Sequence, residues 1–191
     1  HVESHTVIFQ DNKIDDNYKG FISLFGEDIE MGSLGKDVTF VYRPNERESS
    51  ICSTFEISGS GTDLLGFDIV LDSGNPLSSG VAVRASNVSV KYNRIMGGAA
   101  SGIGVTNPWD TDKVNLMSEE EIQVPDKTEN VALVYNVIED FGSSISVSTL
   151  PTGEESFKKY RGVVENVDIR NNKISEGVEG ITLSVAKNEI S

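Results

Sequence analysis

One short pattern of apolar and polar positions recurs along the chain. A short apolar alternation is followed by a turn asparagine and a second short alternation. After a gap comes a third alternation that opens with glycine or serine. The copies occupy residues 7–24, 88–105, 131–147 and 167–183. Period-two alternation in segments this short predicts β-strands, so each copy predicts three strands.

The copies have nearly constant length, whereas the stretches between them vary widely. A fixed period with insertions at one point is typical of a repeat architecture. Equivalent strands are then expected to pair in parallel from one coil to the next, about 4.8 Å apart, around stacked columns of Val, Ile and Leu. We therefore predict an all-β solenoid of about six to seven coils in a single domain, residues 1–191. Its coils are irregular over 25–80, and insertions connect coils at 106–130 and 148–166.

Asparagines occupy two fixed places in the pattern. One file lies at the turn between the first two strands and consists of Asn12, Asn93, Asn136 and Asn172. A second file opens the first strand and consists of Asn87, Asn130 and Asn166. Asparagine tolerates the left-handed backbone of a tight turn, and its amide can bond the equivalent amide of the next coil. The turn file therefore predicts an asparagine ladder.

This sequence pattern resembles the right-handed parallel β-helix repeat of the pectate-lyase-like superfamily, in which an asparagine ladder lines the second turn. The superfamily includes polysaccharide lyases, glycoside hydrolases, epimerases, phage tailspikes and surface proteins. The resemblance implies a secreted or cell-surface carbohydrate-active protein that acts on a polysaccharide as a lyase or a glycoside hydrolase. The alternative is a non-catalytic module that binds glycan, resembles a tailspike or serves as a structural stalk. Fold alone does not decide between them.

The third strand predicts a flat outer face beside the two insertions. Its outward column is small in every aligned coil: Ser23, Ala82, Gly104, Ser146 and Thr182. Trp109, in the first insertion, is the only tryptophan. It is a candidate platform for a sugar ring. The alternative is that it packs against the coil and holds its own loop in place. In the second insertion the candidates for substrate binding are Lys158, Tyr160 and Arg161.

The catalytic and metal candidates are acidic, apart from one arginine. Glu139 and Asp140 are adjacent carboxylates that could act as general acid and base on a glycosidic bond. Alternation on a strand predicts that one of the two is simply solvated. Arg84 follows the third strand and could border an anionic sugar. Asp110 and Asp112 are candidate calcium ligands, although the sequence around them does not match a helix-loop-helix calcium motif.

Composition narrows the partners. The chain has 16 basic and 30 acidic residues, a formal net charge of −14, which disfavours nucleic acid and anionic membrane surfaces. Its one cysteine, Cys52, excludes an internal disulfide, and no apolar run reaches the ~20 residues of a membrane span. We recognise no capping segment at either end, so further β-helix coils or a homo-oligomer partner are expected.

Overall fold

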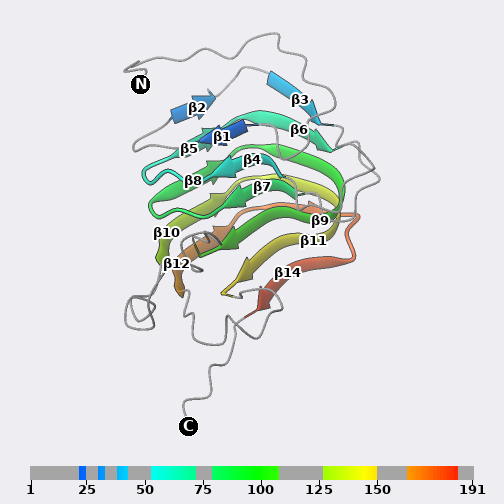
Figure 1. Cartoon of the computed structure of the whole chain (residues 1–191). Helices are drawn as coiled ribbons and strands as arrows, with labels where there is room; N and C mark the ends of the chain where they lie inside the picture. Colours follow the sequence, from blue (N-terminus) through cyan, green and yellow to red (C-terminus); the bar gives the residue numbers. More distant parts are fainter. Residues whose placement is uncertain are drawn as a thin grey trace, which may run out of the picture.

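Three ladders of parallel strands make up the described part of the chain (Figure 1). The computed structural model describes residues 22–24, 30–32, 38–42, 53–71, 79–107, 127–149 and 163–184. Across these residues the secondary structure is entirely β, without a helix, and every strand pairing is parallel. In that same part of the chain there is accordingly no helix long and apolar enough to cross a membrane.

The first ladder is a five-stranded sheet of β2 (Glu30–Gly32), β5 (Asp63–Leu65), β8 (Val88–Lys91), β10 (Lys127–Val134) and β12 (Val163–Arg170). The second contains β3 (Val38–Tyr42), β6 (Phe67–Leu71), the first parts of β9 (Arg94–Thr106) and β11 (Val137–Ser148), and β13 (Lys173–Ser175). The third contains β1 (Ile22–Leu24), β4 (Ser53–Ile57), β7 (Ser79–Val83), the second parts of β9 and β11, and β14 (Glu179–Ser184). The long strands β9 and β11 join the second and third ladders into one curled nine-stranded sheet.

The chain passes through the ladders in the same order each time, and we call each passage a rung. The described residues form five rungs, which are β2–β3–β4, β5–β6–β7, β8–β9, β10–β11 and β12–β13–β14. The strand β1 belongs to the passage before them and pairs with β4. The five rungs are stacked in chain order in Figure 1, from blue at β2 to red at β14. This arrangement of parallel strands in curled sheets is compatible with a β-helix or a related solenoid.

The predicted alignment of the last three copies is confirmed. Val131 pairs with Val88 on one side and Val167 on the other, and Ile145 lies between Ile103 and Ile181 in the same way. The irregular stretch 25–80 forms two rungs of its own. Within this stretch β4 pairs directly with β1, which is the third strand of the first copy.

Aliphatic columns fill the interior. Leu133 is fully buried and pairs in register with Val90 and Ile169. A one-residue error in the repeat alignment would have turned this side chain outward, so its burial confirms the predicted inward face. The largest fully buried side chains are Phe55, Phe141, Ile57, Leu64, Ile69, Ile95, Ile103, Leu133, Ile138, Ile145 and Val81.

Left-handed residues turn the chain at corners of the described rungs, and they line up in three columns. The first corner column is Gly61, Asn87, Asn130 and Asn166; the second is Gly66, Tyr92, Tyr135 and Asn171; the third is Gly97, Asp140 and Glu176. All have φ between 53° and 74°. In the first two columns, the amide of a corner residue donates to the carbonyl that precedes the next corner residue, as in Gly66 N to Lys91 O at 3.2 Å and Tyr92 N to Val134 O at 3.2 Å.

The turn asparagines themselves are not left-handed, which corrects the sequence-based assignment. The left-handed residue is the one before, Tyr92 before Asn93 and Tyr135 before Asn136. A left-handed backbone costs about 1–2 kcal/mol for an ordinary L-residue and much less for glycine or asparagine. The chain nevertheless turns at the preceding residue. The side chains of Asn93 and Asn136 are then able to enter the core, where both are buried.

Amide hydrogen bonds connect the buried turn asparagines. Asn93 Nδ2 donates to Asn136 Oδ1 at 3.1 Å, and Asn136 Nδ2 donates to Asn172 Oδ1 at 3.0 Å. Backbone amides add bonds to the same oxygens, from Asn93 at 3.1 Å and from Asn136 at 2.9 Å. Asn93 and Asn136 are both buried, so these bonds satisfy polar groups that water does not reach. Asn12 lies outside the described residues.

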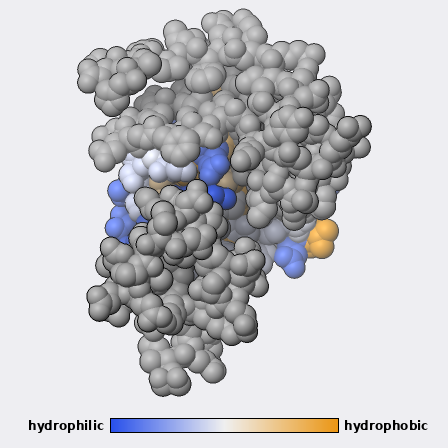
Figure 2. Space-filling model, viewed as in Figure 1, coloured by the Kyte–Doolittle hydropathy of each residue, from blue (hydrophilic) through white to orange (hydrophobic). Residues whose placement is uncertain are grey.

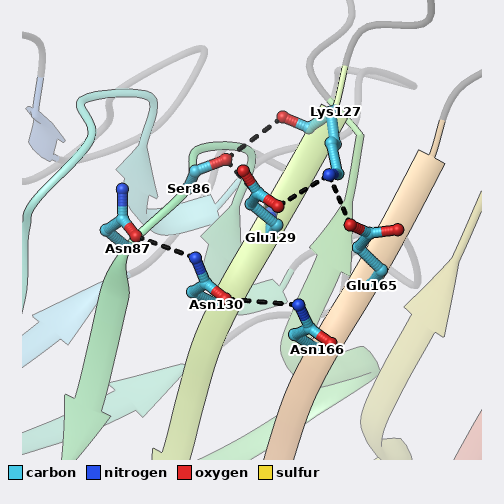
Figure 3. A network of polar contacts seen from close by, with 7 residues as sticks. All are labelled: Ser86, Asn87, Lys127, Glu129, Asn130, Glu165 and Asn166. Atoms are coloured by element: carbon cyan, nitrogen blue, oxygen red, sulfur yellow. Dashed lines mark hydrogen bonds and ion pairs between the residues drawn. The ribbon is translucent and has the colours of Figure 1, made fainter.

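The second asparagine file is exposed and lies beside an ion-pair cluster (Figure 3). Asn130 Nδ2 donates to Asn87 Oδ1 at 3.1 Å, and Asn166 Nδ2 donates to Asn130 Oδ1 at 3.4 Å. Lys127 pairs with Glu129 at 2.7 Å and also with Glu165. The hydrogen bonds that Lys127 donates to Glu129 and, second, to Glu165 raise the pKa of Lys127, and the hydrogen bond from Lys127 lowers the pKa of Glu129.

Both predicted insertions leave the third ladder and return to the first at neighbouring points. Thr106 pairs with Ser148 where they leave, and Lys127 pairs with Val163 where they return. Thr128 Oγ1 donates to the Thr106 carbonyl at 2.9 Å, which closes the stem of the first insertion. Residues 108–126 and 150–162 lie outside the described residues.

Candidate functional site

An open depression of about 450 Å³ lies around the third corner column. Arg94 and Met96 contribute from the start of β9, Glu139 and Asp140 from β11, and Glu176 from the corner after β13. Val70 and Gly97 complete its lining. The depression therefore draws on four successive strands and brings three carboxylates together with one guanidinium.

Glu139 is held in place by two partners. Its Oε2 lies 3.2 Å from Arg94 Nη2, and its Oε1 accepts a hydrogen bond from Ser175 Oγ at 3.5 Å. The Glu139 side chain is 21% exposed and that of Arg94 is 51% exposed. Arg94 therefore neutralises Glu139 at the wall of the depression, and this carboxylate is fixed rather than free.

Asp140 and Glu176 occupy the same position in adjacent rungs, and both are exposed. Asp140 has φ 63° and Glu176 has φ 61°. The left-handed backbone at Asp140 interrupts the strand alternation, so Glu139 and Asp140 both border the depression instead of facing opposite sides. Glycine would hold this backbone at lower cost. Aspartate adopts it occasionally, as asparagine does, so the strain is greater at Glu176 than at Asp140.

Close packing explains the glycines beside the depression. A Cβ on Gly97 would lie 2.6 Å from the Leu71 carbonyl oxygen, and one on Gly98 would lie 2.8 Å from Phe141 Cε1. Both residues also have positive φ, 73° and 137°. The rung that carries Arg94 therefore needs glycine where the next two rungs carry Asp140 and Glu176.

Arg84 does not line this depression. It lies after β7 and pairs with Glu56 at 3.2 Å, with both side chains 30% exposed. Glu56 stands between Ser23 and Ala82 in the outward column of the third ladder. The prediction that this column holds only small side chains is therefore wrong at Glu56, whose coil lacks the turn asparagine used for the alignment. Its carboxylate neutralises the candidate cation.

Hydroxyl groups bond to one another across the rest of this face. Ser101 Oγ lies 2.9 Å from Ser146 Oγ, and Ser143 Oγ lies 2.8 Å from Thr182 Oγ1. Thr182 Oγ1 also donates to Glu179 at 2.8 Å. The hydroxyls near Gly104 thus have partners within the face.

The other sequence candidates lie outside the described residues. They are Trp109, Asp110 and Asp112 in the first insertion and Lys158, Tyr160 and Arg161 in the second. Among the residues that the structure does describe, no group of three or more His, Cys, Asp or Glu side chains could hold a metal ion. Calcium at Asp110 and Asp112 remains a prediction.

An exposed aromatic pair was not predicted. The rings of Tyr92 and Tyr135 stack with centroids 5.1 Å apart and an interplanar angle of 3°. They remain 47% and 49% exposed. The repeat alignment contains the signal for this pair, because each tyrosine directly precedes a turn asparagine and the two must therefore be neighbours.

The described surface is otherwise largely polar. From the side shown in Figure 2, most visible residues with assigned colours are hydrophilic. Apart from the tyrosines, the exposed large hydrophobic residues of the described part are Val178, Ile181 and Leu183. All three belong to the last rung.

Fold and site together define an all-β protein of stacked parallel rungs, with an acidic depression at one corner and a tyrosine pair at another. The chain matches no family model, no curated protein and no solved structure. The functional argument therefore rests on the chemistry of these two corners.

Proposed function

We propose that this chain is a right-handed parallel β-helix with an asparagine ladder that acts on a polysaccharide as a secreted or cell-surface protein. The repeated register and the hydrogen bonds among Asn93, Asn136 and Asn172 support the fold. A polysaccharide is a long polymer, and an elongated stack of equivalent rungs offers it a surface with a matching repeat. The depression at the third corner column is the proposed site.

The placement of Asp140 and Glu176 carries the proposal. They stand at equivalent corners of adjacent rungs, and adjacent rungs are about 4.8 Å apart. Glycoside hydrolases use two carboxyl groups that flank the scissile bond, about 5–5.5 Å apart in retaining enzymes and about 6.5–9.5 Å apart in inverting ones. One carboxylic acid protonates the leaving oxygen, and the other carboxylate attacks the sugar or activates water. Glu139 orients Arg94 beside them.

Hydrolysis fits these residues better than elimination. A lyase must neutralise a uronate and then remove a proton with a base. Arg94 already pairs with Glu139 at 3.2 Å, and Arg84 pairs with Glu56 at 3.2 Å. Neither arginine candidate is therefore available to a uronate without breaking an ion pair, whereas Asp140 and Glu176 are exposed to a substrate.

A non-catalytic glycan-binding module is the second candidate, and the tyrosine pair favours it. Half-exposed, stacked aromatic rings suit the apolar face of a sugar without any chemistry. In this case the carboxylates of the depression would accept hydrogen bonds from sugar hydroxyls. Trp109 of the first insertion would act as a further aromatic contact.

The test is a screen against neutral and uronate-containing polysaccharides, with measurement of reducing ends and of the absorbance of unsaturated products. We expect new reducing ends without unsaturated products. Asp140→Asn and Glu176→Gln should each lower turnover by at least about 100-fold. Both changes keep the size of the side chain, and asparagine suits the left-handed corner.

Asp168→Asn is the matched control, because Asp168 is an exposed carboxylate of β12 that pairs with Arg170 at 2.8 Å and does not line the depression. It should leave turnover unchanged. Unsaturated products would assign a lyase. Binding without any product would assign the non-catalytic module, and neither binding nor turnover on any polymer would overturn the proposed function.

A further inference from the structure

The second corner column departs from the residue types that its backbone favours. The first column, with the same left-handed geometry, is Gly61, Asn87, Asn130 and Asn166, all of which suit positive φ. The second column places tyrosine at its two middle positions, with φ 57° at Tyr92 and 59° at Tyr135. The turn geometry does not explain these tyrosines, because the neighbouring column makes an equivalent turn without them.

Stacking between the two rings offsets part of this strain but does not hide the rings. They are parallel within 3° at 5.1 Å, which is close to the spacing of about 4.8 Å between rungs. The two rings are therefore stacked about one rung apart. Since 47% of Tyr92 and 49% of Tyr135 stay exposed, their apolar surface is not used up by folding.

The rung before Tyr92 brings no side chain to this column, because its corner residue is Gly66. Tyr92 stacks against Tyr135 on one side, and on the other side the next position of the column is Gly66. On the far side of Tyr135 the column continues with Asn171. The glycine rung is thus the place where a third ring would continue the stack.

We propose that the Tyr92 face over Gly66 is a stacking site for a pyranose ring of a neutral glycan. This inference rests on the proposed function and names the class of sugar and the residues that receive it. The C–H face of a pyranose packs flat against an aromatic ring, and the two phenol hydroxyls offer hydrogen bonds at the rim. The site lies at a different corner from the acidic depression.

The charges around the column select a neutral sugar over a uronate. Lys91 directly precedes Tyr92 and pairs with Asp63 at 4.0 Å, and Arg170 directly precedes Asn171 and pairs with Asp168 at 2.8 Å. Arg94, two residues after Tyr92, pairs with Glu139 at 3.2 Å. These three cations are already neutralised. Among the described residues a fourth cation, Lys173, lies two residues after Asn171 and has no ion pair, but it belongs to the last rung, on the far side of Tyr135 from Gly66. A sugar carboxylate over Gly66 would therefore find no uncompensated cation among the described residues beside it. The net charge of −14 opposes an anionic chain further.

The experiment titrates the whole chain with cellohexaose, mannohexaose and hexagalacturonate by isothermal calorimetry. Tyr92→Asn and Tyr135→Asn each place in the second column the residue that the first column already uses, so the fold should be kept. Gly66→Asn leaves both tyrosines in place and puts a side chain over the stacking face. For the neutral hexaose that binds best, we expect Tyr92→Asn and Gly66→Asn each to weaken binding by about tenfold or more.

Gly61→Asn is the matched control, because Gly61 lies in the same rung as Gly66 and has nearly the same backbone angle, φ 74° against φ 72°. It should bind as the original chain does. If Tyr92→Asn and Gly66→Asn bind as tightly as the original chain, the stacking site is refuted while the proposed function stands. Tighter binding of hexagalacturonate would refute the neutral class. If the original chain binds none of these hexaoses, and no polymer of the larger screen either, both proposals fail.

Discussion

Replacement of Asn136 by leucine tests the buried amide network. Asn136 is 1% exposed and makes four side-chain hydrogen bonds. Its Oδ1 accepts from the backbone and side-chain nitrogens of Asn93, both at 3.1 Å. Its Nδ2 donates to the Val90 carbonyl at 2.8 Å and to Asn172 Oδ1 at 3.0 Å. Leucine has a similar volume but can make none of these bonds.

The magnitude follows from which groups lose a partner. The Asn93 side-chain nitrogen keeps its bond to the Leu64 carbonyl at 3.0 Å, and Asn172 Oδ1 keeps the Asn136 backbone amide at 2.9 Å. The Asn93 backbone amide and the Val90 carbonyl each lose their bond to this side chain. A buried polar group left without a partner costs about 1–3 kcal/mol. We therefore expect Asn136→Leu to lower the free energy of unfolding by about 2–5 kcal/mol.

Urea and thermal unfolding followed by circular dichroism measure this loss. For a chain of this length it corresponds to a fall in Tm of about 4–20 °C. The control is Asn130→Gly, which removes two exposed amide bonds, at 3.1 Å to Asn87 and at 3.4 Å from Asn166, and keeps a residue suited to φ 57°. It should change stability by no more than about 0.5 kcal/mol. Equal losses in the two variants would refute the claim that burial makes the turn file important.

Three further outcomes are expected. Leu133→Ala should cost about 2–5 kcal/mol in urea unfolding, because the side chain is fully buried and leaves a cavity; a loss below about 1 kcal/mol would mean that the core collapses around it. Gly102→Ala should cost about 1–3 kcal/mol, since its Cβ would lie 2.5 Å from Ile138 Cγ2, whereas Gly180→Ala, with no atom within 4 Å, should be neutral in the same assay. The Glu129 pKa is lowered from its ordinary 4.5. The contribution of the Lys127–Glu129 pair to the stability of the protein is therefore present above pH 4.5 and is lost as the pH falls through the lowered pKa of Glu129 in the folded state. The Lys127 pKa is raised from 10.5, so this contribution is also lost as the pH rises through that higher value. The difference in Tm between the original chain and Lys127→Met should shrink at both extremes, and a difference independent of pH would contradict the pairing.

The sequence predicts the ladders well where asparagine marks the turn. The alternation around Leu133 fixes which side chains point inward, and the constant spacing to Asn136 fixes the pairing partner. Both features can be read within a single repeat. Each rung must bury alternate side chains and must turn at the same place, so the same features recur in every copy. That is why the pairing of residues 88–105 with 131–147 and 167–183 could be read from the pattern.

The pattern fails for residues 25–80 for a physical reason. Phe67 occupies the position of the turn asparagine in its rung, and its backbone amide donates to Asn93 Oδ1 at 2.9 Å. Its ring packs against Phe55 with centroids 5.5 Å apart. The corners of this rung are Gly61 and Gly66, which satisfy the same backbone requirement as asparagine. The rung therefore obeys the same rules with different residues.

The candidate sites depend on neighbours that are distant in sequence. Glu139 and Asp140 were singled out from the sequence, but Arg94 and Glu176 come from the rungs on either side. Their approach depends on the left-handed backbone at the third corner, which alternation does not encode. The tyrosine pair was within reach of the repeat alignment, since Tyr92 and Tyr135 share a place in it.

The corner columns also have a consequence for binding strength. Each rung contributes one corner position to each column, with the same backbone geometry but its own side chain, at a spacing that backbone hydrogen bonding sets at about 4.8 Å. A polymer that binds at several corner positions gains avidity, because each further contact becomes intramolecular once the first has formed. Even weak contacts at single corners could then hold a long ligand, and the number of rungs that present the same side chain would tune its residence time.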